Sequence, residues 1–162
     1  MTVALFNNPK KVVVAIVVFV LIFLFMAWQS ARADSEFNLY GGSAVVKGFT
    51  PALGATIKWP EAGPGVMDWE AGFLLSGESE FRGKQPNTIS VFGMLVPKWK
   101  RLETGLGFAY HNNAWSYSCQ ETFALMAGYR GENLSVRWMH FSTAGSCKPN
   151  PGRDFLVAGW RF

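Results

Sequence analysis

The chain has 162 residues, of which 49% are apolar, and carries 15 Lys and Arg against 11 Asp and Glu. Three of those cations, Lys10, Lys11 and Arg32, lie in an N-terminal segment that we expect to be removed, which leaves 12 of the 15. The mature chain is then nearly neutral, so its charge gives no reason to expect a nucleic-acid partner.

The N-terminal segment has the features of a secretory signal peptide. Lys10 and Lys11 precede an unbroken apolar run over residues 12–28, and Ala31 and Ala33 occupy the small-residue positions that a signal peptidase recognises. We therefore expect a signal peptide over residues 1–33 and one mature domain over residues 34–162. The apolar run is near the lower length limit for a spanning helix, so an uncleaved N-terminal anchor is the alternative.

The mature chain has no segment with a helical period, and it alternates large apolar residues with small or polar ones. This period of two is typical of strands that have two different faces. In one segment, for example, Leu106 and Phe108 share a face, while Gly105 and Gly107 share the other. The sequence predicts about eight strands, in chain order 37–48, 53–60, 67–77, 88–97, 101–111, 122–130, 133–142 and 153–162.

Two all-β folds fit this pattern, a soluble periplasmic sandwich and a transmembrane barrel. The glycine-rich small face favours the barrel because it suits a narrow interior, and the aromatic residues at strand ends match interfacial girdles. The small face also carries charges that could pair across the interior: Asp68, Glu70, Glu103, Arg130, Arg137 and Arg161. An even number of strands closes the sheet without an edge. We therefore expect an eight-stranded antiparallel transmembrane β-barrel of the bacterial outer membrane.

The connections between the predicted strands alternate in length. Those around 61–65, 97–101 and 130–133 are short, as expected of periplasmic turns, while 76–87, 111–121 and 142–152 are longer, as expected of outward loops. Cys119 and Cys147 fall in two of the outward loops, on the same side of the membrane. An exported protein favours a disulfide between them, and two free thiols are the alternative.

Three polar residues continue the lipid-facing rows of the last two strands. His140 and Ser142 follow Leu134, Val136 and Trp138 in parity, and Asp154 shares the parity of Leu156 and Trp160. Adjacent antiparallel strands would bring these three side chains together at the outward end. A serine nucleophile needs a base, and the histidine that serves as base needs a carboxylate. The cluster predicts a serine hydrolase acting on acyl esters of outer-leaflet lipid; the alternative is a wet strand end where a loop begins.

The pattern His140-x-Ser142-x-Ala144-Gly145, followed by Lys148-Pro149-Asn150, Gly152 and Asp154, resembles the PagL-type lipid A 3-O-deacylases. The resemblance implies an eight-stranded outer-membrane barrel that hydrolyses the ester at the 3 position of lipid A. It implies Ser142 as nucleophile, His140 as general base and acid, and Asp154 as the partner that orients His140. It also implies an oxyanion hole from Asn150 and the backbone near Ala144 and Gly145, and no metal cofactor. The family usually has Asn in place of Thr143 and Glu in place of Asp154.

Other polar residues have weaker claims to a role. Lys148 and Arg153 flank the site and are candidates for contacts with lipid A phosphates, with solvated loop cations as the alternative. We expect His111 to be an ordinary loop or rim histidine and Glu103 to belong to a charge pair in the barrel interior.

The sequence thus predicts an exported outer-membrane serine esterase that removes the 3-O-linked acyl chain of lipid A, with its site facing the outer leaflet and lipopolysaccharide as its partner. The main alternative is a non-catalytic small barrel that acts through its surface loops. A third possibility is transfer of the acyl chain to an acceptor other than water. The oligomeric state is left open.

Overall fold

The computed structural model describes residues 35–45, 49–60, 67–78, 87–97, 99–112, 119–147 and 152–162; the predicted signal peptide lies outside these ranges. Within them the chain forms eight strands: β1 (Glu36–Val45), β2 (Phe49–Trp59), β3 (Met67–Ser76), β4 (Thr88–Pro97), β5 (Leu102–His111), β6 (Glu121–Arg130), β7 (Leu134–Ser142) and β8 (Arg153–Arg161). No helix in the described residues is long and apolar enough to cross a membrane.

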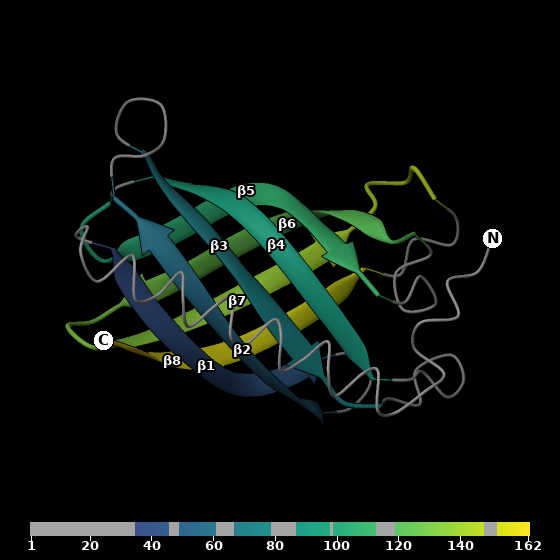
Figure 1. Ribbon diagram of the computed structural model, residues 1–162, viewed down its shortest axis with the longest axis horizontal. Helices are drawn as coiled ribbons and strands as arrows, with labels where there is room; N and C mark the ends of the chain where they lie inside the picture. The colour runs from purple at the N-terminus through teal and green to yellow at the C-terminus, as the bar shows by residue number, and fades with distance from the viewer. Residues whose placement is uncertain are drawn as a thin grey trace. The chain divides into compact units, whose positions relative to one another are not determined.

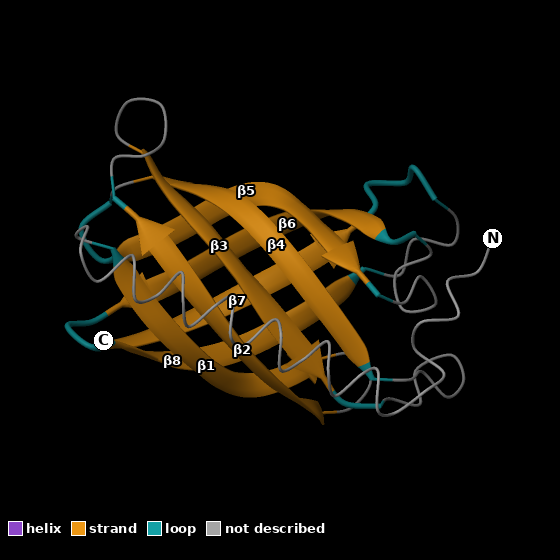
Figure 2. Cartoon of the chain, viewed as in Figure 1, coloured by secondary structure: helices purple, strands orange, loops and turns teal. Residues whose placement is uncertain are grey.

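The strands close into a barrel. Each pairs antiparallel with the next along the chain, and β8 pairs with β1, so the sheet has no free edge (Figures 1 and 2). The predicted antiparallel eight-stranded barrel is therefore confirmed. We call the end with the connections at 60–66, 98–101 and 131–133 the turn end, and the opposite end, where β7 stops and β8 begins, the loop end.

The boundaries agree with the predicted strands within a few residues, and the largest difference is at β2. It begins at Phe49, whereas the sequence predicted a start at 53. Pro51 lies within this early part of the strand, although proline has no N–H to donate to a sheet. In the structure Pro51 pairs with Ser43 near the loop end, and its carbonyl still accepts a hydrogen bond of 3.0 Å from Gly77 N–H. The missing donor thus weakens only the extremity of the strand.

The outer face of the barrel is apolar over several neighbouring strands. Leu106, Phe108, Leu134 and Leu156 are each at least half exposed. Such a continuous apolar surface is unfavourable in water and marks contact with a partner or with lipid. The predicted assignment of the large apolar rows to the outside is confirmed.

The interior holds buried apolar side chains together with polar and charged ones. Its charged part is a salt-bridge cluster of Lys58, Glu70, Glu103 and Arg137, which we call the interior charge cluster. Arg137 donates from Nε to Glu103 Oε2 at 2.8 Å and from Nη2 to Oε1 at 3.1 Å, and it also pairs with Glu70. Lys58 Nζ lies 2.6 Å from Glu103 Oε1. The predicted pairing across the interior is confirmed for Glu70, Glu103 and Arg137, and Lys58 is a member that the sequence did not reveal.

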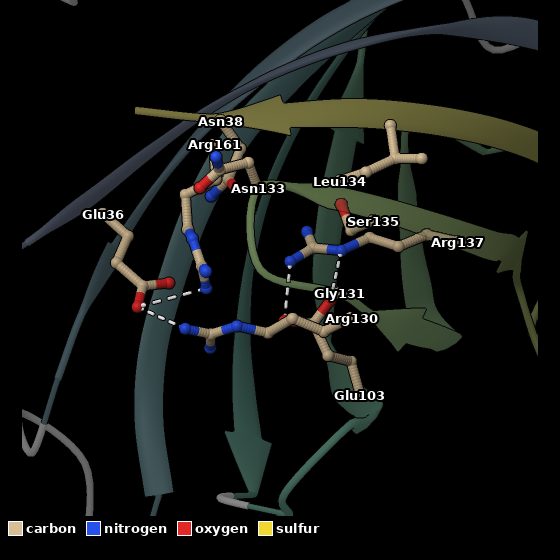
Figure 3. Close-up of a pocket in the computed structure, with 10 residues that line it drawn as sticks. All are labelled: Glu36, Asn38, Glu103, Arg130, Gly131, Asn133, Leu134, Ser135, Arg137 and Arg161. Atoms are coloured by element: carbon tan, nitrogen blue, oxygen red, sulfur yellow. Dashed lines mark hydrogen bonds and ion pairs between the residues drawn. The ribbon is translucent and has the colours of Figure 1, made fainter.

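The other predicted interior cations pair at the turn end instead. Arg130 and Arg161 both face Glu36, with Nη–Oε1 distances of 2.5 and 3.7 Å (Figure 3). These residues lie at strand ends, where the side chains are only partly buried. They close the mouth of the barrel rather than its centre.

Candidate active site

The register of the last two strands brings the predicted catalytic residues together. His140 of β7 lies directly opposite Asp154 of β8, and Ser142 is two residues further along β7 on the same face. All three occupy the outward-facing row at the loop end, and the side chains of His140 and Asp154 are 25% and 40% exposed. The predicted juxtaposition of His140 and Asp154 is therefore observed.

A hydrogen bond joins the imidazole to the carboxylate. The distance from His140 Nδ1 to Asp154 Oδ1 is 2.9 Å. Because an ionised carboxylate only accepts hydrogen bonds, this contact places the proton on Nδ1 of the neutral ring and leaves Nε2 with a free lone pair. Nε2 is the nitrogen that a general base would use.

Trp138 completes the support of this pair, although the sequence indicated only a lipid-facing aromatic residue there. Its indole Nε1–H donates to Asp154 Oδ1 at 2.9 Å, so that oxygen accepts from both rings. The indole also stacks on His140, with ring centroids 5.7 Å apart and planes 20° from parallel. The one signal in the sequence is the spacing, since residues two apart on a strand share a face.

Replacing Trp138 by phenylalanine tests the indole N–H while keeping an aromatic ring over His140. If the cluster is catalytic, loss of a hydrogen bond to a charged acceptor should lower kcat about tenfold and leave KM for an ester substrate nearly unchanged. Trp160→Phe on the neighbouring strand is the matched control, because Trp160 is also a half-exposed outward tryptophan. Equal activities of the two variants would argue against a role for the indole N–H.

Gly152 also lies close to the imidazole of His140. Its φ is +58°, and a Cβ there would lie 2.7 Å from His140 Cε1 and 3.3 Å from Nε2. These distances are too short for ordinary contact, so only glycine leaves the ring in its observed position. The indole of Trp138 and the backbone of Gly152 thus both limit where the His140 ring can lie.

The substitution Gly152→Ala should therefore displace the imidazole. Gly145→Ala is a matched control, because Gly145 also has a positive φ, +86°, but a Cβ there would meet nothing within 4 Å. Both variants should lose about 1 kcal/mol of stability from backbone strain. Only Gly152→Ala should lower kcat, by about 100-fold, the effect expected of a misplaced catalytic group. A similar loss of kcat in both would show that loop strain, not contact with His140, limits the rate.

The chain turns sharply after Ser142. Ala144 has a φ of +50°, which is uncommon for a residue with a side chain, and its N–H donates to Ser142 Oγ at 3.2 Å. The Ser146 N–H and hydroxyl both donate to the Thr143 carbonyl, at 3.0 and 2.6 Å. This turn places a backbone donor beside the serine oxygen.

The predicted disulfide between Cys119 and Cys147 is present, with the Cα atoms 6.0 Å apart. It ties Cys119, two residues before β6, to the loop that follows Ser142. Thr143 is buried and donates from Oγ1 to the Cys147 carbonyl at 3.2 Å. The covalent bond and the turn therefore anchor the same short segment.

The remaining predicted site residues have different outcomes. Lys148 and Asn150 lie outside the described residues. Arg153 was expected to flank the site and face lipid phosphates or water; instead it has inward parity, is 3% exposed and lies over the Phe155 ring. That expectation was wrong. Arg153 is the first residue of β8, as predicted, and because it alternates with the outward-facing Asp154 its side chain lies inside the barrel.

His111 also differs from the expectation of an ordinary rim histidine. It is fully buried inside the barrel, with Nδ1 2.8 Å from Ser90 Oγ and Nε2 2.7 Å from Thr122 Oγ1. Both ring nitrogens thus have hydroxyl partners, and the residue belongs to the interior packing. Within the described ranges, no group of three His, Cys, Asp or Glu side chains is arranged to hold a metal ion.

A comparison with family models matches residues 50–162 to the lipid A 3-O-deacylase (PagL) family, which is more than half of the chain. The chain belongs to the PagL family. The membership confirms the resemblance seen in the sequence and makes this barrel a lipid A 3-O-deacylase of the outer membrane by family.

Solved structures agree on the fold. The crystal structure of the outer membrane enzyme PagL matches with a TM-score of 0.58 and 17% identity, over 78% of this chain and 98% of that one. The Yersinia pestis outer membrane protein Ail matches with a TM-score of 0.50 and 15% identity, over 80% and 100%. At these identities the matches show the barrel architecture alone. A comparison with curated protein sequences finds no match.

The structure accounts for both departures from the usual PagL pattern. Asp154 is one methylene shorter than the expected glutamate, yet its Oδ1 reaches His140 Nδ1 at 2.9 Å. Thr143, where PagL-type proteins usually have asparagine, supports the loop through Cys147, as described above. Neither substitution leaves the local geometry without support.

Proposed function

We propose that this PagL-family barrel hydrolyses the 3-O-linked acyl ester of lipid A with Ser142, His140 and Asp154 as its catalytic triad. The observation that carries the assignment is the 2.9 Å contact between His140 Nδ1 and Asp154 Oδ1 on the lipid-facing wall. Ionisable groups are costly on such a wall and need a reason to be there. A reaction on membrane lipid supplies that reason.

The chemistry follows the usual division of roles in a serine hydrolase. His140 Nε2 takes the proton of the Ser142 hydroxyl as Oγ attacks the acyl carbonyl carbon. The Ala144 N–H, which lies 3.2 Å from Oγ, is suitably placed to donate to the oxyanion that forms, and we assign the Asn150 amide and the Gly145 backbone to the same hole. His140 then returns the proton to the departing 3-hydroxyl of the sugar. Water attacks the acyl-enzyme and releases a 3-hydroxy fatty acid.

The surroundings of the triad suit an acyl-chain substrate. On β6, Phe123 pairs with Ser142 and Leu125 pairs with His140, and both side chains are about two-fifths exposed on the outer wall. An acyl chain lying against them would bring its ester to the serine from the side, without leaving the leaflet. Lys148 remains a candidate for a lipid A phosphate contact.

Mass spectrometry of lipid A from cells that make the protein tests this function. Loss of one 3-hydroxyacyl chain, together with the free 3-hydroxy fatty acid, is the expected result. Acyl transfer would give the same loss but move the chain to another acceptor, so the released product separates the two reactions. An unchanged lipid A spectrum in the presence of folded barrel would favour a non-catalytic protein that acts through its loops.

A further inference from the structure

A second site is indicated at the turn end, away from the triad. An open hollow of about 510 Å³ is lined by Lys100, Arg101, Arg130, Gly131, Glu132 and Arg161. These residues come from the β4–β5 turn, the end of β6 with the turn after it, and the end of β8. In a mature chain that is nearly neutral, four cations around one hollow are a local concentration of positive charge.

The carboxylates nearby neutralise only part of this charge. Glu36 serves both Arg130 and Arg161, as Figure 3 shows, and Glu132 is the one acid in the lining. Among the described residues, Lys100 and Arg101 form no ion pair, and Arg101 Nη1 donates only to the Tyr129 hydroxyl, at 3.1 Å. Among the described side chains, four cations thus face two carboxylates, which is an excess of about two positive charges.

The hollow adjoins an apolar surface. Leu102 pairs with Tyr129 and Leu134 pairs with Trp160 in the register of β5–β8, and each of the four side chains is at least half exposed on the outer wall. Exposed cations beside exposed aromatic and aliphatic side chains are the arrangement expected at the headgroup level of a membrane.

We infer that this hollow binds the phosphate headgroup of an anionic diacyl phospholipid, with the acyl chains lying along the outward faces of β5–β8. Arginine suits a phosphodiester because its planar guanidinium can donate two parallel hydrogen bonds. A free phosphate ion would satisfy the cations but leave the apolar row uncovered. In the predicted topology the turn end faces the periplasmic leaflet, which is opposite the leaflet of the triad.

Native mass spectrometry of the detergent-solubilised barrel tests this inference by comparing retention of phosphatidylglycerol with retention of zwitterionic phosphatidylcholine. The wild type should retain phosphatidylglycerol preferentially. Lys100→Gln with Arg101→Gln should weaken that binding about fivefold for each cation removed. The charge-preserving pair Lys100→Arg with Arg101→Lys should bind within about twofold of the wild type. Equal retention of the two lipids, or no effect of the glutamine pair, would overturn the proposal.

Two further measurements test whether binding depends on the charge of the hollow and whether it requires a whole lipid. Glu132→Gln removes the acid in the lining and should strengthen phosphatidylglycerol binding, whereas Glu121→Gln makes the same change at an exposed position at the loop end and should not. Inorganic phosphate at the concentration of the lipid should not displace it. Full displacement would mean a small-anion site instead of a lipid site. None of these variants touches Ser142, so lipid A deacylation should be retained in all of them whichever way the binding result falls.

Discussion

Ser142→Ala is expected to abolish release of 3-hydroxy fatty acid from lipid A. The alanine has no hydroxyl to attack the ester, while His140, Asp154 and the barrel remain. Losing the nucleophile of a serine hydrolase typically lowers kcat by about 10⁶-fold and leaves only the contribution of substrate binding and the oxyanion hole. Release of fatty acid by purified barrel in lipid A micelles, followed by mass spectrometry, measures the effect.

Ser146→Ala is the matched control for this result. Ser146 lies in the same loop, and its hydroxyl donates to the Thr143 carbonyl at 2.6 Å, but its backbone N–H makes a second bond to that carbonyl at 3.0 Å. The turn should therefore survive, and activity should remain within about tenfold of the wild type, the upper end expected for one lost neutral hydrogen bond. If Ser142→Ala retained activity while folded, Ser142 would not be the nucleophile.

Arg137→Met is expected to lower the free energy of unfolding by about 3–5 kcal/mol, because it removes one partner from a buried set of charges. Arg137 is 1% exposed and contacts both Glu70 and Glu103. After the substitution only Lys58 would remain to balance two buried carboxylates. Urea-induced unfolding of the barrel in lipid vesicles, monitored by tryptophan fluorescence, gives the measurement.

Arg130→Met provides the comparison for this stability effect. The Arg130 side chain is 29% exposed at the mouth of the barrel, where water screens its pair with Glu36, so the cost should stay near 1 kcal/mol or below. Adding Glu103→Gln to Arg137→Met should recover part of the lost stability by restoring charge balance. Equal losses for Arg137→Met and Arg130→Met would show that the interior charge cluster has no special importance.

Most of the fold could be predicted from the sequence because every strand of a barrel wall alternates between outward-facing and inward-facing residues. Alternate residues of β5 and β8 face lipid or the interior, and that period survives without knowledge of any partner strand. The start of β2 at Phe49 could not be predicted from the sequence. Proline lacks the N–H that a strand interior needs, and only the structure shows that Pro51 lies near the end of the strand. The role of Lys58 was hidden for a different reason. Its partner Glu103 is 45 residues away, and only the closed register brings the two together.

Part of the candidate site could be predicted from the sequence for the same reason. Parity placed His140 and Asp154 on one wall, and the antiparallel register then set them opposite each other. The sequence did not predict that Trp138 and Gly152 support His140. Parity gives the face on which a residue lies, but it does not show that the Trp138 N–H reaches Asp154 or that Gly152 lies close to the imidazole. Arg153 was misjudged although the last strand was predicted to begin there. Its parity is opposite to that of Asp154, which places its side chain inside the barrel, but it was treated as a cation flanking the site.

The packed interior also bears on the permeability of the barrel. Beside Arg137, at the mouth of the barrel, the cavity measures only about 10 Å³, no more than one water molecule needs. Along the described strands, salt bridges and aromatic rings occupy the space that a porin would leave to solvent. The described part of the barrel therefore has no wide water-filled space beside Arg137, and the chemistry proposed for the wall needs none.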